Sequence, residues 1–510
     1  MVKRFLCTTK KGEGNMKKSL STLIAIMLIA ALVFSGCSKS KDQKTDQNDT
    51  SKDTTNVTEP AENPDEGTDS ETDKSVFDEP VTLSYLAWNL GTAEEDNLER
   101  KMLAKFQEVY PNVTINIVEV PLNEDGSAGN YGDYLNTLAS QKALPDVFMW
   151  TSVPDTASAG WAADVSAYAK DDTEFQNVVA AVRDGGKIGE KVYGVPFQMH
   201  LFGMMQNYNI YEELNVDPLP YSYTLDDLLA KIAATTTNKY RGVDNFAIED
   251  WGALVNSDTI GFGTFDGDKY NFSSEEFAKA IDTYKEVAEK GYTGNLSFTE
   301  AWLPEGASWA WGEGYIANQY EASWSIAGFQ NGERPFKSDL IPLPNEKVIL
   351  VPDFIFVAAN TANAEASYEL AKWMSFGVDG MKARMEIKDE FGIVGYSGLP
   401  LNAGYDAEID EYFLKDYADF PMFLQVYASL KEKPENVYVE GFKVIPGYTK
   451  SRFDADTGVV GTVNGEEKSL TMSELIISII KGDKQLSDYA AEMDKVANNI
   501  YNDAKANLPK

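Results

Sequence analysis

Two residue types are almost missing from this 510-residue chain, and their scarcity excludes several kinds of chemistry. There are two cysteines, Cys7 and Cys37, and one histidine, His200. If translation starts at Met16, Cys7 is not part of the protein and Cys37 is left alone. No internal disulfide is therefore expected. A Ser-His-Asp triad, a Cys-His pair or a multi-histidine metal site would each need His200. We therefore expect no catalytic residue, no metal and no cofactor.

Basic residues are also few. The chain holds 45 Lys and Arg against 80 Asp and Glu, a formal net charge of -35, and 43% of its residues are apolar. Nucleic-acid binding and adhesion to an anionic membrane surface both require basic patches, so neither is expected of the body of the protein. The length and the apolar content are enough for at least two hydrophobic cores.

The N-terminus has the residue order of a secretory signal. Lys17 and Lys18 follow Met16, an apolar run occupies residues 20–34, and two small residues precede Cys37. This run of 15 residues falls short of the roughly 20 that a membrane span needs. The pattern predicts that residues 1–36 are a signal peptide, with the true start at Met1 or Met16, and not a transmembrane anchor.

The end of this signal, Phe34-Ser35-Gly36-Cys37, resembles the bacterial lipobox, in which the cysteine is diacylated. The lipobox usually has Leu where this chain has Phe34. Two acyl chains anchor a protein stably to a membrane. Residues 38–77 are polar almost throughout and cannot form a core. We predict that residues 37–77 comprise lipidated Cys37 and a disordered tether, which together hold the body at the outer face of the cell membrane, in contact with it only through the lipid.

The body alternates between strand and helix patterns. Residues 81–86 are β-rich, and the apolar spacing in residues 98–109 predicts a helix that ends before Pro111. Residues 113–120 predict the next strand. A helix over 134–140 and a strand over 146–150 then repeat the order. This alternation predicts an α/β fold.

Short motifs follow one another along the body. They lie at residues 110–113, 134–148, 192–196, 207–218, 224–232, 309–324, 340–344, 364–376, 473–482 and 486–501. In this order they resemble the family 1 extracellular solute-binding proteins, the maltose-binding-protein-like subunits of ABC sugar importers. The match departs at residues 221–223 and is poor over 396–470.

The resemblance implies a periplasmic-binding-protein-like fold, with two lobes, a hinge and a central ligand cleft. The chain is expected to cross between the lobes near Pro196, at residues 348–353 and at residues 396–400. The N-terminal lobe would then comprise 78–196 and 348–396, and the C-terminal lobe 197–347 and 397–510. Few crossings allow the lobes to close on a ligand as rigid bodies.

Candidate ligand-binding residues are those expected near this cleft. Sugars offer flat apolar faces to aromatic rings and hydroxyls to carboxylates and amides. Residues that follow strands, lie at a crossing or match a family motif meet these needs: Trp88, Asn89, Trp150, Gln198, His200, Trp251, Trp324 and Asp353. Trp251 is expected in a loop beside two carboxylates, whereas Trp161 and Trp373 are expected to pack within the protein.

The resemblance implies a monomeric, extracytoplasmic lipoprotein that captures a carbohydrate and delivers it to two permease subunits. The abundance of aromatic residues favours an oligosaccharide. Two alternatives stay open: a lipid-anchored sugar sensor or adhesin of the same fold, and a secreted glycoside hydrolase, which needs only two carboxylates. Asp454, Asp456 and Gly458 resemble a calcium loop, but Gly465 stands where that loop needs a glutamate.

Overall fold

The computed structural model of the protein describes residues 75–510, apart from 92–96, 124–128, 300, 393–398, 403 and 405. The expected signal peptide, Cys37 and the tether up to residue 74 lie outside the described residues. The chain divides between Ser75 and Val76, and the fold below is that of the compact unit Val76–Lys510. None of its helices, within the described ranges, has the length and apolar content that a membrane crossing requires.

Most of the strands belong to one large mixed sheet. The strands are β1 (Val81–Leu86), β2 (Val113–Ile117), β3 (Val147–Trp150), β4 (Lys187–Ile188), β5 (Lys191–Val192), β6 (Gly194–Asn207), β7 (Arg241–Asp244), β8 (Ile316–Ala322), β9 (Ser338–Ile341), β10 (Val348–Val357), β11 (Val437–Val439), β12 (Asp456–Val463) and β13 (Glu466–Thr471). The sheet has the order β2-β1-β3-β10-β6-β8-β7, with β11 also paired to β10 and β9 to β6.

Helices cover both faces of this sheet. They are α2 (Leu98–Val109), α3 (Tyr131–Ser140), α4 (Val153–Ser158), α5 (Ser166–Ala169), α6 (Thr173–Gln176), α7 (Ala180–Gly185), α8 (Tyr208–Glu213), α9 (Leu225–Thr235), α10 (Ile248–Val255), α11 (Glu275–Glu289), α12 (Ile326–Gln330), α13 (Ala364–Met374), α14 (Val378–Phe391), α15 (Ala407–Leu414), α16 (Pro421–Glu432), α17 (Gly441–Val444), α18 (Met472–Ile480) and α19 (Leu486–Ala506).

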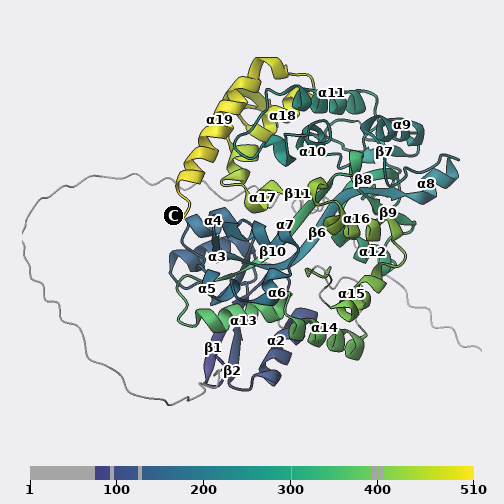
Figure 1. Ribbon diagram of the computed structural model, residues 1–510. Helices are drawn as coiled ribbons and strands as arrows, with labels where there is room; N and C mark the ends of the chain where they lie inside the picture. Colours follow the sequence, from purple (N-terminus) through teal and green to yellow (C-terminus); the bar gives the residue numbers. More distant parts are fainter. Residues whose placement is uncertain are drawn as a thin grey trace, which may run out of the picture. The chain divides into compact units, whose positions relative to one another are not determined.

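Two long antiparallel strands, β6 and β10, run through both halves of the sheet (Figure 1). In the first half, β3 pairs with residues 354–357 of β10, and β1 and β2 lie beyond β3. In the second half, β11 pairs with residues 348–350 of β10, while β8 and β9 pair with residues 202–207 of β6. The segments that join the two halves are therefore the middle parts of β6 and β10.

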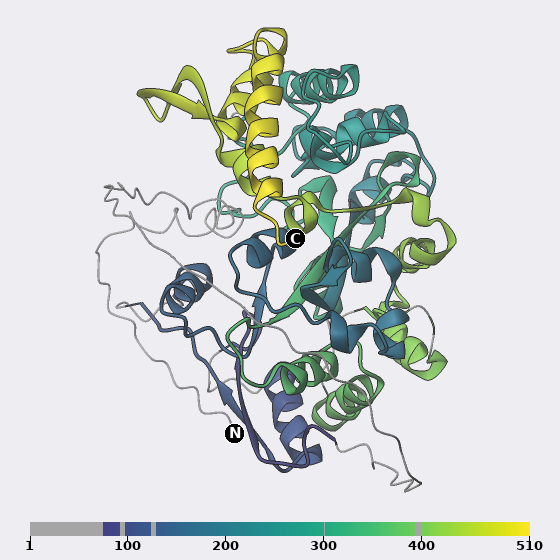
Figure 2. The same ribbon diagram turned by 60° about the vertical axis from the view of Figure 1, so that its left-hand side comes forward.

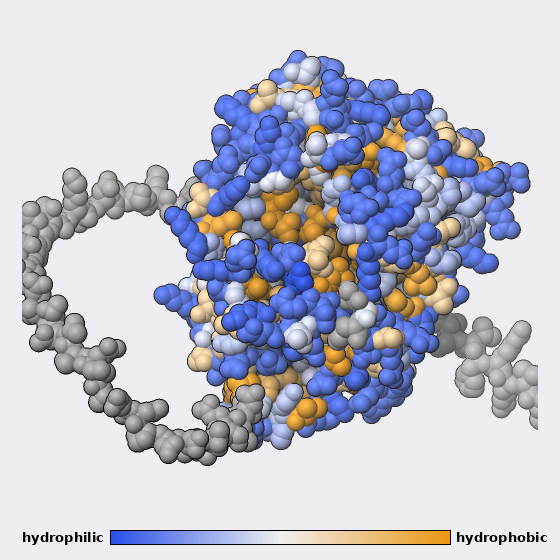
Figure 3. Space-filling view, in the orientation of Figure 1, coloured by the Kyte–Doolittle hydropathy of each residue, from blue (hydrophilic) through white to orange (hydrophobic). Residues whose placement is uncertain are grey.

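The hydrophobic cores differ between the two faces of the sheet. One face carries a single core that includes Met149 in the first half and Met205 in the second. The opposite face carries two separate cores, one containing Phe148 and Phe354 and the other containing Met204. Figure 3 shows apolar side chains in a band across the middle of the molecule, with hydrophilic surfaces above and below. Hydrophobic packing on this face of the sheet is therefore divided into two cores.

Local sequence signals explain where the elements begin and end. Residues 81–86 and 98–109 form the strand and the helix that the sequence predicts. The strand expected over 113–120 ends at Ile117, and the helix expected from residue 134 begins at Tyr131 because the Asn130 side chain caps it. The Thr224 hydroxyl and the Asp227 carboxylate form a reciprocal capping box at the start of α9. The α/β class follows from this order.

The region in which the motif match is poor contains one departure from expectation. Residues 399–402 were expected to enter the second lobe, but Asn402 pairs with Val178 and the Leu401 carbonyl accepts from Val179, both in the first half. Further on, β12 and β13 form a separate hairpin that stands away from the helices around it (Figure 2, yellow-green). The Asp456 carboxylate accepts from Gly458 N–H at 2.9 Å within this hairpin.

Candidate functional site

The middle of the sheet is the point at which strands from both halves end. In the first half, β3 ends at Trp150, which pairs with Phe354 of β10, and β1 ends at Leu86, which pairs with Phe148 of β3. In the second half, β8 ends at Ala322, which pairs with Phe202 of β6. Ligand sites in α/β sheets form beyond the carboxyl ends of strands. The candidate site therefore lies where these ends converge, over the central residues of β6 and β10.

Three of the predicted side chains lie together at this point. In the pairing of β6 with β10, Gln198 is opposite Asp353 and His200 is opposite Val351, with an irregularity between Asp353 and Phe354. Side chains alternate between the faces of a strand. Gln198 and His200 therefore face the same side as Met204, between the two separate cores. Asp353 contacts both of them.

Asp353 is the centre of a hydrogen-bonded group. Its Oδ1 accepts from Lys443 Nζ at 2.7 Å, and its Oδ2 accepts from Gln198 Nε2 at 3.0 Å. His200 Nε2 lies 3.9 Å from Oδ2. Burial acts to raise the pKa of Asp353, but the charge of Lys443 outweighs it, with help from His200 and Gln198, and the pKa is lowered. The carboxylate is thus ionised and preorganised to accept hydrogen bonds.

His200 is a neutral side chain in this group. Burial lowers its pKa to about 4, although the charge of Asp353 acts in the opposite direction. The imidazole packs edge to face against Trp324, with ring centroids 5.0 Å apart. A neutral imidazole both donates and accepts hydrogen bonds. His200 therefore supplies polarity to the site without adding charge.

Trp324 lies directly beyond the end of β8, at the rim of the site. Its ring also meets Phe202 at 5.0 Å, yet 42% of the residue is exposed. The neighbouring Ser323 hydroxyl accepts from Leu201 N–H at 3.2 Å, which fixes this turn against β6. A large indole face is therefore held in place and open to solvent.

Two further tryptophans lie on the first half of the sheet. Trp88 is 37% exposed and packs edge to face against Tyr131, and Tyr131 stacks on the partly buried Trp150. The Tyr131 hydroxyl donates to the carbonyls of Met149 at 2.9 Å and Leu86 at 3.3 Å. Tyr131 thus ties together the ends of β1 and β3, and Trp88 offers a second exposed indole. No local sequence pattern indicates this role for Tyr131.

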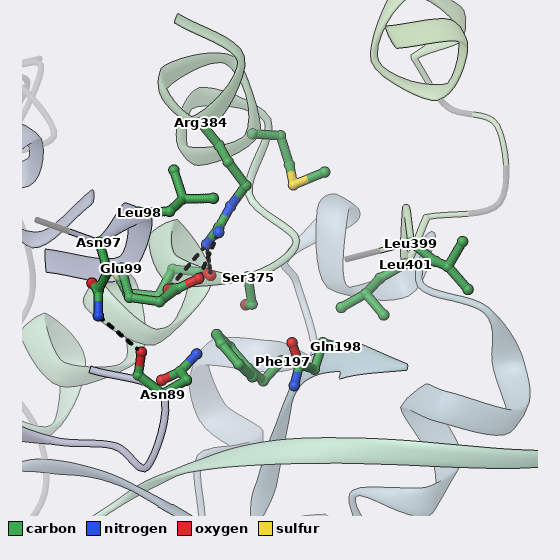
Figure 4. Close-up of a pocket in the computed structure, with 12 residues that line it drawn as sticks. Asn89, Asn97, Leu98, Glu99, Phe197, Gln198, Ser375, Arg384, Leu399 and Leu401 are labelled. Carbon is green, nitrogen blue, oxygen red and sulfur yellow. Dashed lines mark hydrogen bonds and ion pairs between the residues drawn. The ribbon is translucent and has the colours of Figure 1, made fainter. Parts of the chain in front are cut away.

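Asn89 and Gln198 share a pocket of about 210 Å³ (Figure 4). Arg384 lies at one end of it and donates to the two carboxylate oxygens of Glu99 at 2.6 and 3.2 Å. Apolar residues close the pocket on the side of the continuous core: Leu98, Phe197, Met374, Met381, Leu399 and Leu401. Asn89 therefore lies near Gln198 and the group around Asp353, but the pocket that it lines opens toward the other face of the sheet.

Charged residues from distant parts of the chain complete the site on the second half. Asp250, in the first turn of α10, pairs with buried Arg452 at 2.6 Å. Glu440 comes directly before α17, and its N–H donates to the Leu350 carbonyl at 2.9 Å. Burial raises the pKa of Glu440 to about 7 although Lys443 opposes the rise, and burial together with the charge of Asp250 raises that of Glu249. None of these residues is among the ligand-binding candidates predicted from the sequence.

The expectation for Trp251 is wrong. The residue lies in helix α10 and not in a loop, and it is 0% exposed. Its indole N–H donates to the Phe246 carbonyl at 2.7 Å, and its ring packs against Tyr320 and Phe246. Trp251 is a core residue of the second half and has no surface that a ligand could contact in this structure.

These features describe a two-lobed α/β fold in which polar and aromatic side chains gather where the strand ends of the two halves converge. The chain belongs to the bacterial extracellular solute-binding protein family, whose sequence profile matches residues 91–376, more than half of the chain. The resemblance inferred from the motif order is thereby confirmed. A comparison with curated protein sequences gives no match.

Solved structures of sugar-binding proteins share this two-lobed fold. An ABC substrate-binding protein from Listeria monocytogenes in complex with cycloalternan is 17% identical, with a TM-score of 0.62 over 82% of this chain and 99% of that chain. The cyclic α-maltosyl-1,6-maltose binding protein from Arthrobacter globiformis is 18% identical, with a TM-score of 0.58 over 83% and 100%. The sugar-binding protein MalE from Xanthomonas citri is 14% identical, with a TM-score of 0.60 over 84% and 98%. At these identities the likeness establishes the fold.

Proposed function

We propose that this chain captures a carbohydrate, and specifically an oligosaccharide, between its two lobes and delivers it to the two permease subunits of an ABC importer. The observation that carries the proposal is the placement of two exposed indoles, Trp88 and Trp324, on opposite halves of the sheet, with the polar group around Asp353 between them. Sugar rings need both kinds of contact, apolar faces and hydrogen-bonding edges. Family membership and the sugar-binding neighbours support the same function.

The arrangement suggests how each part would act. Trp88 and Trp324 would stack on sugar rings from the two lobes, while Gln198, His200 and the ionised Asp353 would hydrogen-bond the hydroxyls. Only contacts from both lobes favour a closed form over an open one. The two-stranded connection through β6 and β10 is the place for such a hinge. The closed form would then present both lobes together to the permease.

Anchoring at the membrane is a further part of the proposal. Cys37 would carry the lipid at the outer face of the cell membrane, with the tether extending to the folded unit. Replacing Cys37 by Ala should release the protein from the membrane fraction of expressing cells and remove labelling by a palmitate analogue. Retention of Cys37→Ala in that fraction, with labelling unchanged, would exclude the lipid anchor at this position.

The first experiment is a melting-temperature screen of the Cys37→Ala chain without its signal peptide against plant and microbial oligosaccharides. Amino acids and peptides serve as controls. A ligand that binds only the folded state raises the melting temperature with the logarithm of its concentration over Kd. A rise with one glycan series and none with the controls is expected. A rise with peptides alone would overturn the carbohydrate assignment, and release of shorter sugars would reveal a hydrolase instead.

A further inference from the structure

Four aromatic residues of the first half form a row in which each ring contacts the next: Trp88, Tyr131, Trp150 and Trp161. The ring centroids of Trp88 and Tyr131 are 5.8 Å apart, those of Tyr131 and Trp150 are 6.4 Å apart, and those of Trp150 and Trp161 are 6.2 Å apart. Trp88 is 37% exposed, and the other three residues are partly exposed. The row is therefore part of the surface of the first half.

This row passes the candidate site and then leads away from the second half. Trp150 ends β3 and pairs with Phe354 in the middle of β10. The backbone of Trp161 lies beyond the far end of β10, because its carbonyl accepts from Ala359 N–H at 2.8 Å. Both indoles pack against the core that contains Phe354, on the face toward which Gln198 projects. The row is thus continuous with the polar group at the centre of the sheet.

Backbone contacts hold the middle of the row in place. The Tyr131 hydroxyl donates to the carbonyls of Leu86 and Met149, near the ends of β1 and β3. A Cβ atom on Gly132 would lie 3.1 Å from the Trp150 ring, so this indole lies closely against the first turn of α3. The rings of Tyr131 and Trp150 are nearly parallel, with an angle of 18° between them. Rings that are fixed in this way lose little conformational freedom when a ligand binds.

The indole N–H groups of Trp150 and Trp161 distinguish them from tryptophans that only pack. Trp251 and Trp373, which lie in the cores, each donate this group to a backbone carbonyl, at 2.7 and 3.2 Å. For Trp150 and Trp161 the described part of the chain supplies no such acceptor, and both residues are partly exposed. A partly exposed indole with an N–H to donate suits a sugar, which offers an apolar face and hydroxyl oxygens.

We infer that the ligand site extends along this row, so that the first lobe binds several consecutive rings of one oligosaccharide, with Trp161 as the contact furthest from Asp353. Successive aromatic side chains bind successive units of a polymer in the same manner when they stack on the bases of single-stranded nucleic acids. The inference rests on the proposed function and narrows its substrate class to glycans that reach from Asp353 to Trp161. It gives Trp161 a role besides the packing that its sequence context predicts.

The test compares two lengths of one glycan. The probes are the disaccharide and the hexasaccharide of the series that gives the largest rise in the melting-temperature screen, and calorimetry measures both affinities. We expect the unaltered protein to bind the hexasaccharide about tenfold more tightly. Trp161→Ala should remove most of this advantage and leave the affinity for the disaccharide nearly unchanged. Trp309→Ala, at a position that is 47% exposed and outside the site, is the matched control and should alter neither affinity.

A measurement on the unaltered protein checks the same contact without a substitution. Hydroxyl-radical footprinting followed by mass spectrometry reports the oxidation of each exposed side chain. Saturating hexasaccharide should protect Trp161 from oxidation, whereas saturating disaccharide should not.

Three results would overturn the inference. They are equal affinity of the unaltered protein for both lengths, an equal loss for both lengths in Trp161→Ala, and no protection of Trp161 by the hexasaccharide. The second result would assign Trp161 to packing of the first lobe alone. Failure of every glycan to bind would instead remove the proposed function itself, and this result is distinct from all three.

Discussion

Lys443 and Asp353, 90 residues apart in the chain, form a buried ion pair with 2.7 Å between Nζ and Oδ1. The pair fastens the short helix α17 to the middle of β10, where the two halves of the sheet join. The second carboxylate oxygen holds Gln198 at 3.0 Å. One side chain therefore links a second-half helix to both crossing strands, and the order of the site depends on it.

Replacing Lys443 by Met should destabilise the fold strongly. The change leaves the Asp353 carboxylate buried without its cation, and breaking a buried pair in this way costs about 3–5 kcal/mol. Urea denaturation measures the loss in the free energy of unfolding. Lys468→Met, which removes the exposed pair with Glu474, is the matched control and should cost less than about 1 kcal/mol.

A second variant distinguishes a lost pair from a lost contact. Lys443→Met/Asp353→Leu removes both charges, so it should recover much of the stability that the single change loses. If the double variant is no more stable than Lys443→Met, the unpaired carboxylate is not the source of the cost.

Replacing Trp88 or Trp324 by Ala should weaken glycan binding by roughly 1–3 kcal/mol with little change in melting temperature. Both residues are substantially exposed, so their removal opens no cavity. Trp309→Ala is the control, because Trp309 is 47% exposed and stacks with Arg334 at 4.2 Å on a segment outside the site. Calorimetry of all three variants measures the effect. An equal loss of affinity in Trp309→Ala would show that exposure, and not location at the cleft, decides the result.

Trp251→Ala should behave in the opposite way. The indole is fully buried and packs against Phe246 and Tyr320, so truncation should cost about 3–5 kcal/mol of unfolding free energy. Affinity measured on the folded fraction should change much less than in Trp324→Ala. A stable Trp251→Ala variant that has lost binding would return this residue to the ligand site.

Those parts of the fold that depend on nearby residues could be predicted from the sequence. The apolar spacing in residues 98–109 and Pro111 beyond them predict α2, and the β-rich composition of residues 81–86 predicts β1. The crossings expected near Pro196 and at residues 348–353 lie within β6 and β10, and the role of the polar residues on these strands stays a prediction. Trp251 was assigned wrongly because an eight-residue helix leaves little periodicity, and its burial comes from the tertiary contacts of α10.

The charged part of the site could not be predicted, for a physical reason. Lys443 meets Asp353 across 90 residues of sequence, and Arg452 meets the carbonyl of Glu249 across 203. No local pattern encodes such pairs, and both cations lie where the motif match is poor. Their roles became visible only once the fold brought these segments together.

His200 gives a direct measurement, because it is the only histidine in the chain. Its imidazole resonances should titrate with a pKa of about 4, lowered by burial against the pull of Asp353. A histidine whose folded pKa is depressed stabilises the fold above its ordinary pKa near 6.5, and this stability is lost as the pH falls toward 4. NMR of a sample with labelled histidine checks the value. A pKa above 6 would show that the imidazole is not buried as a neutral group.

The contribution of Glu440 to stability should change with pH in the direction opposite to that of His200. Burial raises its pKa to about 7, although Lys443 opposes the rise. The unfolded chain releases this proton near pH 4.5, so the carboxyl group favours the folded state at low pH and that contribution is lost as the pH rises through 7. Glu440→Gln cannot ionise, and it should therefore be more stable than the unaltered protein at pH 8, by about 1–2 kcal/mol, and nearly equal to it at pH 5. Urea denaturation at the two pH values measures the difference. Because the glutamine keeps the shape of the side chain, a variant as stable as the unaltered protein at both pH values would mean that Glu440 ionises freely and that burial does not raise its pKa.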